Sequence, residues 1–386
     1  MKTVYLDNNA TTAVAPEVVD AMLPFLREHY GNPSSMHAFG GRVGAPVEEA
    51  RAKVAKLLGA EQPSEIIFTS CGTEADSTAI WSALNTETDK NHIITTRVEH
   101  PAVRSLALHL KRKGYQITEL PVDSAGLLDP RDVERAITKK TAIISVMAAN
   151  NETGVLFPIG EIGRIAASHG VKFHTDGVQI VGKEPLDVQS LDVNLLSLSG
   201  HKIHAPKGIG ALYVKRGTRF RPFLIGGHQE RGRRGGTEAV PNIVALGKAA
   251  ELALAHLDEE QTVVRALRDR LEKGLLETIP SSKINGDPVQ RLPNTTNISF
   301  EHVEGEAILL MMSDVGMAAS SGSACTSGSL EPSHVLRAMG VPYTFAHGSI
   351  RFSLSRYNTD DDVSHVLEHM PAIITRLREI SPFWKN

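Results

Sequence analysis

The sequence contains very few cysteines: only Cys71 and Cys325 occur among its 386 residues. Two cysteines cannot supply a disulfide framework, and they cannot supply the four thiolates of a structural zinc site. Neither an HExxH motif nor paired CxxC motifs are found. We therefore expect no resident metal and a reducing, cytoplasmic setting, in which the role of each thiol has to be explained separately.

Long hydrophobic runs and an excess of positive charge are also missing. The longest apolar stretch, Ala142 to Ala149, is far shorter than a membrane span, and Asp7 interrupts the N-terminus before a signal peptide could form. Lysines and arginines number 41 against 44 acidic residues, a net charge of −3 that argues against binding to nucleic acid or an anionic membrane. The basic, glycine-rich segment Arg219 to Thr237 contains only two aromatic residues, so we interpret it as a loop that answers phosphate charge or contacts another subunit.

The length of the chain exceeds that of one ordinary compact core, which favours two domains. From about Ala45 to Lys215, helical patterns alternate with short apolar runs, the pattern of βαβ units in a parallel sheet covered on both faces. The predicted strands read EIIFTS, HIITT, AIISVM, VKFHT, VNLLSLS and GIGALYV.

The character of the sequence changes near Asn242. Ile243 to Ile279 predicts one long helix, broken if at all near Asp258, that bridges to a second domain. That domain contains the strands TTNISF and SIRFSLS and a final helix for which Thr359 is the expected N-cap.

The strand VNLLSLS ends in Ser199, Gly200, His201 and Lys202. Open parallel sheets bind ligands outside the carboxyl ends of their strands. A lysine at the mouth of an apolar pocket is suited to form a Schiff base with an aldehyde, because partial burial lowers its pKa. The alternative interpretation is an ordinary solvated lysine of a surface loop.

Polar residues also follow other strands. Asp176 could keep the ring nitrogen of pyridoxal phosphate protonated, with Gln179 donating to the ring oxygen, although an aspartate after a strand is often just an N-cap. Gly72 and Thr73 lie at the expected start of a helix, where backbone amides could hold a phosphate. The alternative is that Thr73 only caps this helix. The segment matches neither GxGxxG nor GxxxxGK[ST], which excludes dinucleotide and Walker-type sites.

Two further strand ends carry His100, which could stack on a flat ring and transfer protons, and Asn151. Arg351 is a candidate for binding a substrate carboxylate, with Arg356 as the competing choice.

Cys325 lies in SSGSACTSGSLEP, a run almost without bulky side chains, which predicts a mobile, exposed loop. A thiol in such a place is available as a nucleophile. Cys71 lies within the predicted phosphate turn, and we expect it to pack as a small apolar side chain.

Taken together, these motifs resemble those of the NifS/IscS-type cysteine desulfurases, pyridoxal-phosphate enzymes related to class V aminotransferases, and most closely the NifS group associated with nitrogenase clusters. The resemblance runs nearly end to end through YLDNNATT, GNPSSMH, TSCGTEADSTAI, VEHPAV, ANNETG, HTDGVQ, SGHKIHAPKG, GGHQERGRRGGT, SSGSACTSGSLEPSHVLRAMG and IRFSLSR.

The resemblance implies the fold-type-I α/β architecture of pyridoxal-phosphate enzymes. In that architecture a large domain, residues 15–257, contains a mostly parallel seven-stranded sheet. Residues 1–14 and 258–386 would form a smaller α/β domain that carries the catalytic loop at about residues 321–332. A homodimer is also implied.

The resemblance further implies a role for each candidate residue. Lys202 would bind the cofactor covalently, His100 would stack on it and move protons, and Cys325 would receive the sulfur of L-cysteine as a persulfide while the substrate becomes L-alanine. An iron–sulfur scaffold protein would accept the sulfur, and Cys325 would ligate a cluster only transiently. The remaining implied contacts are Asp176 at the ring nitrogen, Gln179 and Asn151 beside the ring oxygen, Gly72, Thr73, Ser199, Gly200 and His201 at the phosphate, Thr237 at the other subunit's phosphate, and Arg351 at the substrate carboxylate.

Two rival functions fit part of the sequence. An aminotransferase or another lyase of the same fold would use Lys202 and Asp176 but would leave Cys325 without a role. A non-catalytic carrier of sulfur or of an iron–sulfur cluster would use Cys325 but would not need Lys202.

Overall fold

The computed structural model describes residues 3–321, 331–382 and 384. Its largest element is a seven-stranded sheet in the order β2-β8-β7-β6-β5-β3-β4, in which only β8 runs antiparallel to its neighbours. The mostly parallel seven-stranded sheet that the resemblance implied is thereby confirmed. Its strands are β2 (Ile66–Thr69), β3 (His92–Thr96), β4 (Gln116–Leu120), β5 (Thr141–Ser145), β6 (Lys172–Asp176), β7 (Leu195–Ser199) and β8 (Gly210–Val214).

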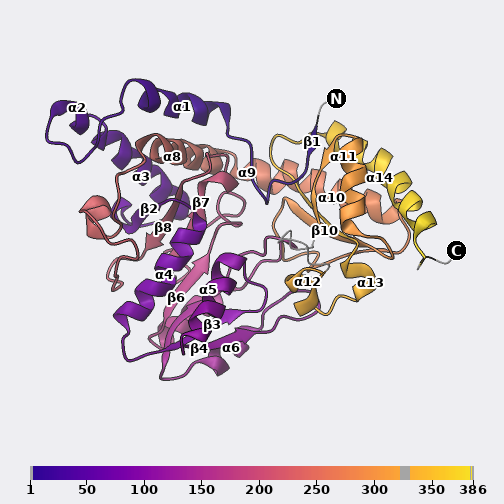
Figure 1. Ribbon diagram of the computed structural model, residues 1–386, viewed down its shortest axis with the longest axis horizontal. Helices are drawn as coiled ribbons and strands as arrows, with labels where there is room; N and C mark the ends of the chain where they lie inside the picture. Colours follow the sequence, from indigo (N-terminus) through magenta and orange to yellow (C-terminus); the bar gives the residue numbers. More distant parts are fainter. Residues whose placement is uncertain (1–2, 322–330, 383, 385–386) are drawn as a thin grey trace.

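Helices cover both faces of this sheet (Figure 1), which is why most of its strands are nearly continuous apolar runs. One face packs against α4 and α5, and the other against α3, α7 and α8. Gly247 of α8 permits close packing on α3, since a Cβ there would lie 2.5 Å from the Cα of Ala50. The helices of this part are α1 (Pro16–Arg27), α2 (Ala38–Gly41), α3 (Gly44–Leu58), α4 (Gly72–Thr86), α5 (Pro101–Arg112), α6 (Pro130–Ala136), α7 (Ile159–Ser168) and α8 (Val240–Ala255).

A second hydrophobic core, at the right of Figure 1, is built from both ends of the chain: Val4 and Leu6 join residues from 264 onward. The division into residues 15–257 and the remainder stays a prediction. A four-stranded antiparallel sheet, in the order β12-β13-β10-β9, forms this part together with a parallel pair of β1 and β11. Its elements are β1 (Val4–Tyr5), β9 (Ser282–Ile284), β10 (Thr295–Phe300), β11 (Met317–Ala318), β12 (Ser320–Ser321), β13 (Ser349–Ser353), α10 (Arg265–Thr278), α11 (Gly305–Asp314), α12 (His334–Ala338), α13 (Tyr343–Ala346) and α14 (Asp360–Ile380).

The connection between the two cores is helical but not continuous. After α8 come a short helix, α9 (Leu257–Glu259), a π-helical turn (Glu260–Val264) and then α10. The predicted single helix is therefore interrupted at the place where the sequence allowed a break. Within the described ranges, no helix is both long and apolar enough to cross a bilayer.

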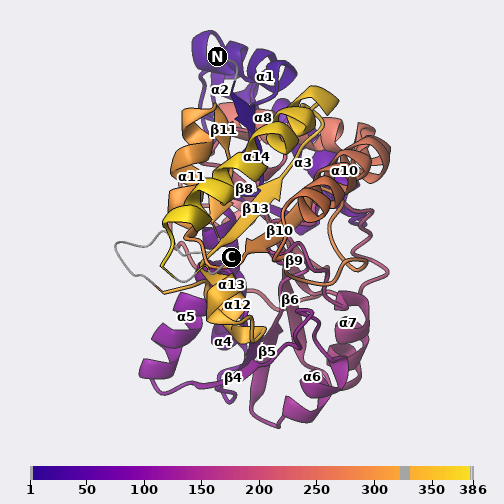
Figure 2. The same cartoon turned by 90° about the vertical axis from the view of Figure 1, so that its right-hand side faces the viewer.

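The N-terminal segment after β1 runs back toward the large sheet. The amide of Thr12 donates to the carbonyl oxygen of His201 at 3.0 Å, and the amide of Ala15 donates to that of His204 at 3.1 Å. Figure 2 shows the molecule turned by 90°, with α10, α11 and α14 of the second core facing the viewer. The segment thus brings residues 7–12 to the carboxyl end of β7.

Candidate active site

A cavity of about 250 Å³ lies where β5, β6 and β7 end and α4 begins. Parallel sheets of this kind bind ligands at that edge. The structure brings together there most of the residues that the sequence singled out: Gly72, Thr73, His100, Asn151, Asp176, Gln179, Ser199, His201 and Lys202, joined by Ala10, Cys71, Asp76, Met147, Ala149 and Val178.

Lys202 ends a short 3₁₀ turn (Gly200–Lys202) that follows β7 directly. Its Nζ donates to two carbonyl oxygens of the N-terminal segment, those of Asn9 at 2.5 Å and Ala10 at 2.7 Å. Burial, supported by the charges of Lys183 and Arg351, lowers the pKa of Lys202 to about 7. A substantial share of the amine is therefore neutral near pH 7 and able to attack an aldehyde.

Asp176 is the last residue of β6 and is only 5% exposed. One carboxylate oxygen accepts a hydrogen bond from the amide of Val178 at 2.9 Å. Burial and the nearby carboxylate of Asp76 raise the pKa of Asp176 to about 7. A buried carboxylate whose charge is poorly compensated would be stabilised by a bound cation such as a protonated ring nitrogen.

Gln179, three residues further along, lies within the same cavity wall. Its Nε2 donates to the carbonyl oxygen of Asn9 at 3.1 Å, so the N-terminal segment contacts both Gln179 and Lys202. The nitrogen of Lys183 donates to the carbonyl oxygen of Gln179 at 3.1 Å.

The first turn of α4 faces the cavity with Gly72 and Thr73. A side chain at position 72 is not tolerated easily, because a Cβ would lie 2.8 Å from Val178. The first amides of a helix have no intrahelical acceptor, so this turn can hold a phosphate. Our expectation for Cys71 is wrong: it is partly exposed, lines the cavity and caps α4, with its Sγ accepting from the amide of Glu74 at 3.4 Å.

Ser199 and His201 line the cavity beside this turn, whereas Gly200 does not. The amide of Gly200 donates to the carbonyl oxygen of Ile209 at 2.9 Å and is not available to a phosphate. The role of Gly200 is instead steric, since a Cβ there would lie 2.9 Å from Ile209 and 3.0 Å from Ala205.

His100 precedes α5 as its N-cap, and its Nδ1 accepts from the amide of Ala102 at 3.1 Å. Nδ1 must then be unprotonated, which places the proton of the neutral ring on Nε2. The ring is accessible from the cavity, yet the surrounding protein and the charges of Lys202 and His334 lower its pKa to about 4. His100 is therefore neutral at pH 7 and presents an N–H donor.

A pH titration tests this protonation state. Because the pKa of His100 is lowered, its neutral form persists as the pH falls below the ordinary histidine value of about 6.5. We expect the ring nitrogens of His100 to titrate well below that value in nitrogen–proton NMR spectra, with a His100→Gln variant identifying the signal. A titration at 6.5 or higher would contradict the assignment.

A layer of buried polar groups beneath the cavity was not predicted from the sequence. Asp76, only 1% exposed, lies 3.5 Å from Nε2 of His174, and one of its oxygens has no hydrogen-bond partner among the described residues. Burial raises the pKa of Asp76 to about 7 and that of Glu99 to about 8. Both lie inside motifs quoted above, three residues after Thr73 and directly before His100, but a single sequence does not show which motif residues point inward.

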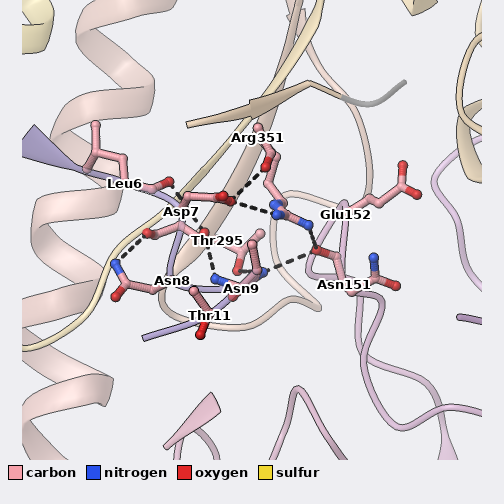
Figure 3. A network of polar contacts seen from close by, with 12 residues as sticks. Leu6, Asp7, Asn8, Asn9, Thr11, Asn151, Glu152, Thr295 and Arg351 are labelled. Carbon is pink, nitrogen blue, oxygen red and sulfur yellow. Dashed lines mark hydrogen bonds and ion pairs between the residues drawn. The ribbon is translucent and has the colours of Figure 1, made fainter. Parts of the chain in front are cut away.

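Arg351 projects from β13 to the wall of the site (Figure 3). Its Nη1 donates to the carbonyl oxygen of Asn151 at 2.9 Å, and Asn151 lines the cavity. The competing candidate, Arg356, instead lies over Tyr357 and donates to its hydroxyl at 3.1 Å. Arg351 is therefore the better placed of the two to meet a substrate carboxylate.

Three predicted site residues that the structure describes, Gly200, Thr237 and Arg351, are not among the residues that line the cavity. Thr237 is exposed and lines a different surface pocket with Thr69 and Glu238. Cys325, and most of the predicted catalytic loop, lie outside the described residues. The basic loop that contains Thr237 is tied to the site nonetheless, because Arg234 pairs with Glu74 of α4 at 2.8 Å.

The residues present fit pyridoxal phosphate. The first turn of α4 with Ser199 suits the phosphate, Asp176 suits a protonated ring nitrogen, and Lys202 is poised for the aldehyde. In the described part of the chain, no group of three or more histidine, cysteine or acidic side chains is arranged to hold a metal ion.

The chain is similar over its length to several known proteins. The family model for aminotransferase class-V matches residues 4–366. The chain is 59% identical over its whole length to "Cysteine desulfurase NifS" of Azotobacter vinelandii, covering 96% of that protein, and 60% identical over 385 residues to "Cysteine desulfurase" of Gluconacetobacter diazotrophicus, again covering 96%. Among solved structures, a "NIFS-LIKE PROTEIN" has a TM-score of 0.91 at 39% identity, with 97% of this chain and all of that one covered. DndA from Streptomyces lividans has a TM-score of 0.77 at 38% identity, with 90% and 99% covered.

Proposed function

The chain belongs to the aminotransferase class-V family, and we propose that it is a pyridoxal-phosphate-dependent cysteine desulfurase that converts L-cysteine to L-alanine and transfers the sulfur to Cys325. The observation that carries the proposal is the cavity in which Lys202, of lowered pKa, shares one wall with Asp176 and the first turn of α4. The full-length similarity to proteins named as cysteine desulfurases favours this activity over amino transfer.

Several residues would hold the cofactor. Lys202 would bind its aldehyde carbon, Asp176 its ring nitrogen, and His100 the face of its ring, while the ring oxygen and the phosphate would take the remaining contacts. When bound, pyridoxal phosphate withdraws electrons from the α-carbon of an amino acid and thereby weakens bonds to that carbon and beyond. The remaining contacts are Gln179 and Asn151 at the ring oxygen, and Gly72, Thr73, Ser199 and His201 at the phosphate.

We assign each step on the substrate to a different side chain of the protein. Arg351 binds the α-carboxylate, and Lys202, once released as a free amine, takes the proton from the α-carbon. The Cys325 thiolate attacks the substrate sulfur: a sulfur–sulfur bond forms as the bond between sulfur and the β-carbon breaks. The electron pair of that bond stays with carbon, which gains a proton and becomes the methyl group of alanine. We assign the supply of that proton to the N–H on Nε2 of His100, and two observations support this: Nδ1 accepts a backbone hydrogen bond, and His100 lines the cavity.

The persulfide on Cys325 must pass its sulfur to an acceptor. We propose an iron–sulfur scaffold protein, in a nitrogenase-associated or general assembly route, in line with the NifS name of the relative from Azotobacter vinelandii. A cytoplasmic location suits a chain with two cysteines and a thiolate nucleophile. We also propose a homodimer in which Thr237, exposed in the isolated chain, reaches the phosphate of the partner subunit.

The experiment that tests the function is an absorbance spectrum of the purified protein, followed by product analysis with L-cysteine. Lysine-bound pyridoxal phosphate absorbs visible light, and borohydride bleaches that band. We expect the band, and we expect alanine to form from cysteine without any keto acid. Amino transfer that depends on a keto acid, with cysteine inert, would establish the aminotransferase instead, and a colourless protein that carries sulfur would establish the carrier.

A further inference from the structure

The N-terminal motif YLDNNATT contains an acidic residue, Asp7, to which the sequence assigned no role. In Figure 3 its side chain faces the guanidinium of Arg351. Nη2 of Arg351 donates to Oδ1 of Asp7 at 2.7 Å, while Nη1 donates to the carbonyl oxygen of Asn151 at 2.9 Å. The guanidinium is thus held at two points, one on the N-terminal segment and one on the cavity wall.

Arg351 has N–H donors that the described residues do not use. A guanidinium has five N–H groups, and two are used by Asp7 and Asn151. The residue is only 8% exposed, and its buried Nε has no acceptor among the residues that the structure describes. Because Nε is covered by protein, a carboxylate would use the second N–H groups of Nη1 and Nη2, and it would not need to displace Asp7.

Asp7 also makes hydrogen bonds to β12 and within its own segment. Its Oδ1 accepts a second hydrogen bond from the hydroxyl of Ser320 in β12 at 2.8 Å. Its carbonyl oxygen accepts from the amides of Ala10 and Thr11, closing the turn whose carbonyl oxygens hold Lys202. One residue thereby fixes Arg351 through its side chain and supports the contacts of Lys202 through its backbone.

Two effects of Asp7 on an incoming carboxylate oppose each other. Its negative charge weakens the attraction of Arg351 for an anion, but its hydrogen bond fixes the direction of the planar guanidinium. Bidentate recognition of a carboxylate depends on that direction, and an arginine side chain without this anchor has many rotamers. The side chains of Arg351 and Asp7 are only 10% and 19% exposed, so salt screens this pair little. We nevertheless expect orientation to dominate, because a guanidinium that points in the wrong direction cannot make both hydrogen bonds to a carboxylate.

We propose that Asp7 is the positioning residue that orients Arg351 for the α-carboxylate of the amino-acid substrate. The proposal rests on the proposed function in taking pyridoxal phosphate as the cofactor and an amino acid, bound through Arg351, as the substrate. It concerns binding and not the fate of the sulfur, so it is tested with ligands that carry no sulfur.

The test compares L-alanine with ethylamine, which is the same molecule without its carboxylate. Both are titrated into the cofactor-loaded protein and followed by the visible absorbance of the cofactor. We expect Asp7→Ala to weaken L-alanine binding about 10-fold or more and to leave ethylamine within about 2-fold. Asp7→Asn keeps an oxygen acceptor and should recover most of the loss. In cysteine turnover, KM should rise more than kcat falls.

Two further variants serve as controls. Ser320→Ala removes only the second hydrogen bond of Oδ1 and should leave L-alanine affinity near that of the wild type. Asp360→Ala removes a surface carboxylate that pairs with Arg270 at 2.9 Å and does not line the cavity, and it should change the binding of neither ligand.

Equal losses for both ligands in Asp7→Ala, no loss for either, or tighter binding of L-alanine would each overturn the proposal. If the wild type formed no alanine from cysteine, the proposed function would fail, while the comparison of L-alanine with ethylamine would still decide the role of Asp7.

Discussion

Replacing Lys202 with alanine is expected to abolish covalent attachment of the cofactor and to lower alanine production from cysteine by about 10⁴-fold or more. In the proposed mechanism Lys202 supplies both the amine that attacks the aldehyde and the base that removes the α-proton, so one substitution would remove both functions. Its position after β7 and its pKa of about 7 are what make the amine available for either step near neutral pH.

The measurement is borohydride reduction followed by intact mass. The wild type should gain the mass of the reduced cofactor, and Lys202→Ala should not. The variant should still bind the cofactor reversibly, because Asp176 and the first turn of α4 remain. Lys207→Ala, an exposed lysine five residues away, is the matched control and should behave as the wild type. A cofactor adduct on Lys202→Ala, or turnover at the wild-type rate, is incompatible with the assignment of Lys202.

Much of the large sheet could be predicted because its strands are buried on both faces. Six of the seven strands, from EIIFTS to GIGALYV, stood out as short apolar runs between helical patterns. The pattern of apolar runs did not predict the seventh strand, β4. It is the edge strand QITEL, and only its last residue, Leu120, is buried. An edge strand has one neighbour and needs no apolar run, so periodicity alone does not reveal it.

Local capping signals were equally informative. Thr359 caps α14 as predicted, with its hydroxyl accepting from the amide of Asp362 and the Asp362 carboxylate accepting in return from the amide of Thr359. Cys71 shows the limit of this approach, because a thiol rarely serves as an N-cap. Its neighbours Gly72 and Thr73 suggested a helix start, but nothing in the sequence indicated that the sulfur itself would accept the Glu74 amide.

The sequence predicted which residues at the strand ends form the site, but it did not predict the hydrogen bonds that connect them to the N-terminal segment. Lys202, Asp176, His100 and Asn151 each follow a strand of the large sheet, and strand order alone brings them to one edge. Asp7 and Asn9 come from the N-terminal segment, which precedes the large sheet in the sequence. The carbonyl oxygen of Asn9 accepts hydrogen bonds from Lys202 and Gln179. Because every residue has a backbone carbonyl group, the residue types in the sequence do not indicate such contacts.

Replacing Cys325 with alanine is the second change for which we expect a very large effect, a loss of alanine production from cysteine of about 10³-fold or more. The reason is chemical: without a thiolate to accept the sulfur, the bond between sulfur and the β-carbon has no nucleophile to drive its cleavage. Cofactor and substrate binding should persist, because the residues that we propose for them are unchanged: Lys202, Asp176 and the first turn of α4 for the cofactor, and Arg351 for the substrate carboxylate. Cysteine should therefore still alter the visible absorbance of the Cys325→Ala protein.

The chain offers a matched comparison, since Cys71 is its only other thiol. After brief exposure to L-cysteine, intact mass should show one added sulfur atom on the wild type and on Cys71→Ser, in which a serine can take over the cap of α4. Cys325→Ala should show none. Two outcomes would contradict the assignment of Cys325 as the nucleophile. One is normal turnover by Cys325→Ala, and the other is an added sulfur that is lost in Cys71→Ser and kept in Cys325→Ala. The first outcome would point to cleavage without protein nucleophilic assistance, and the second to a thiol at the mouth of the cofactor cavity.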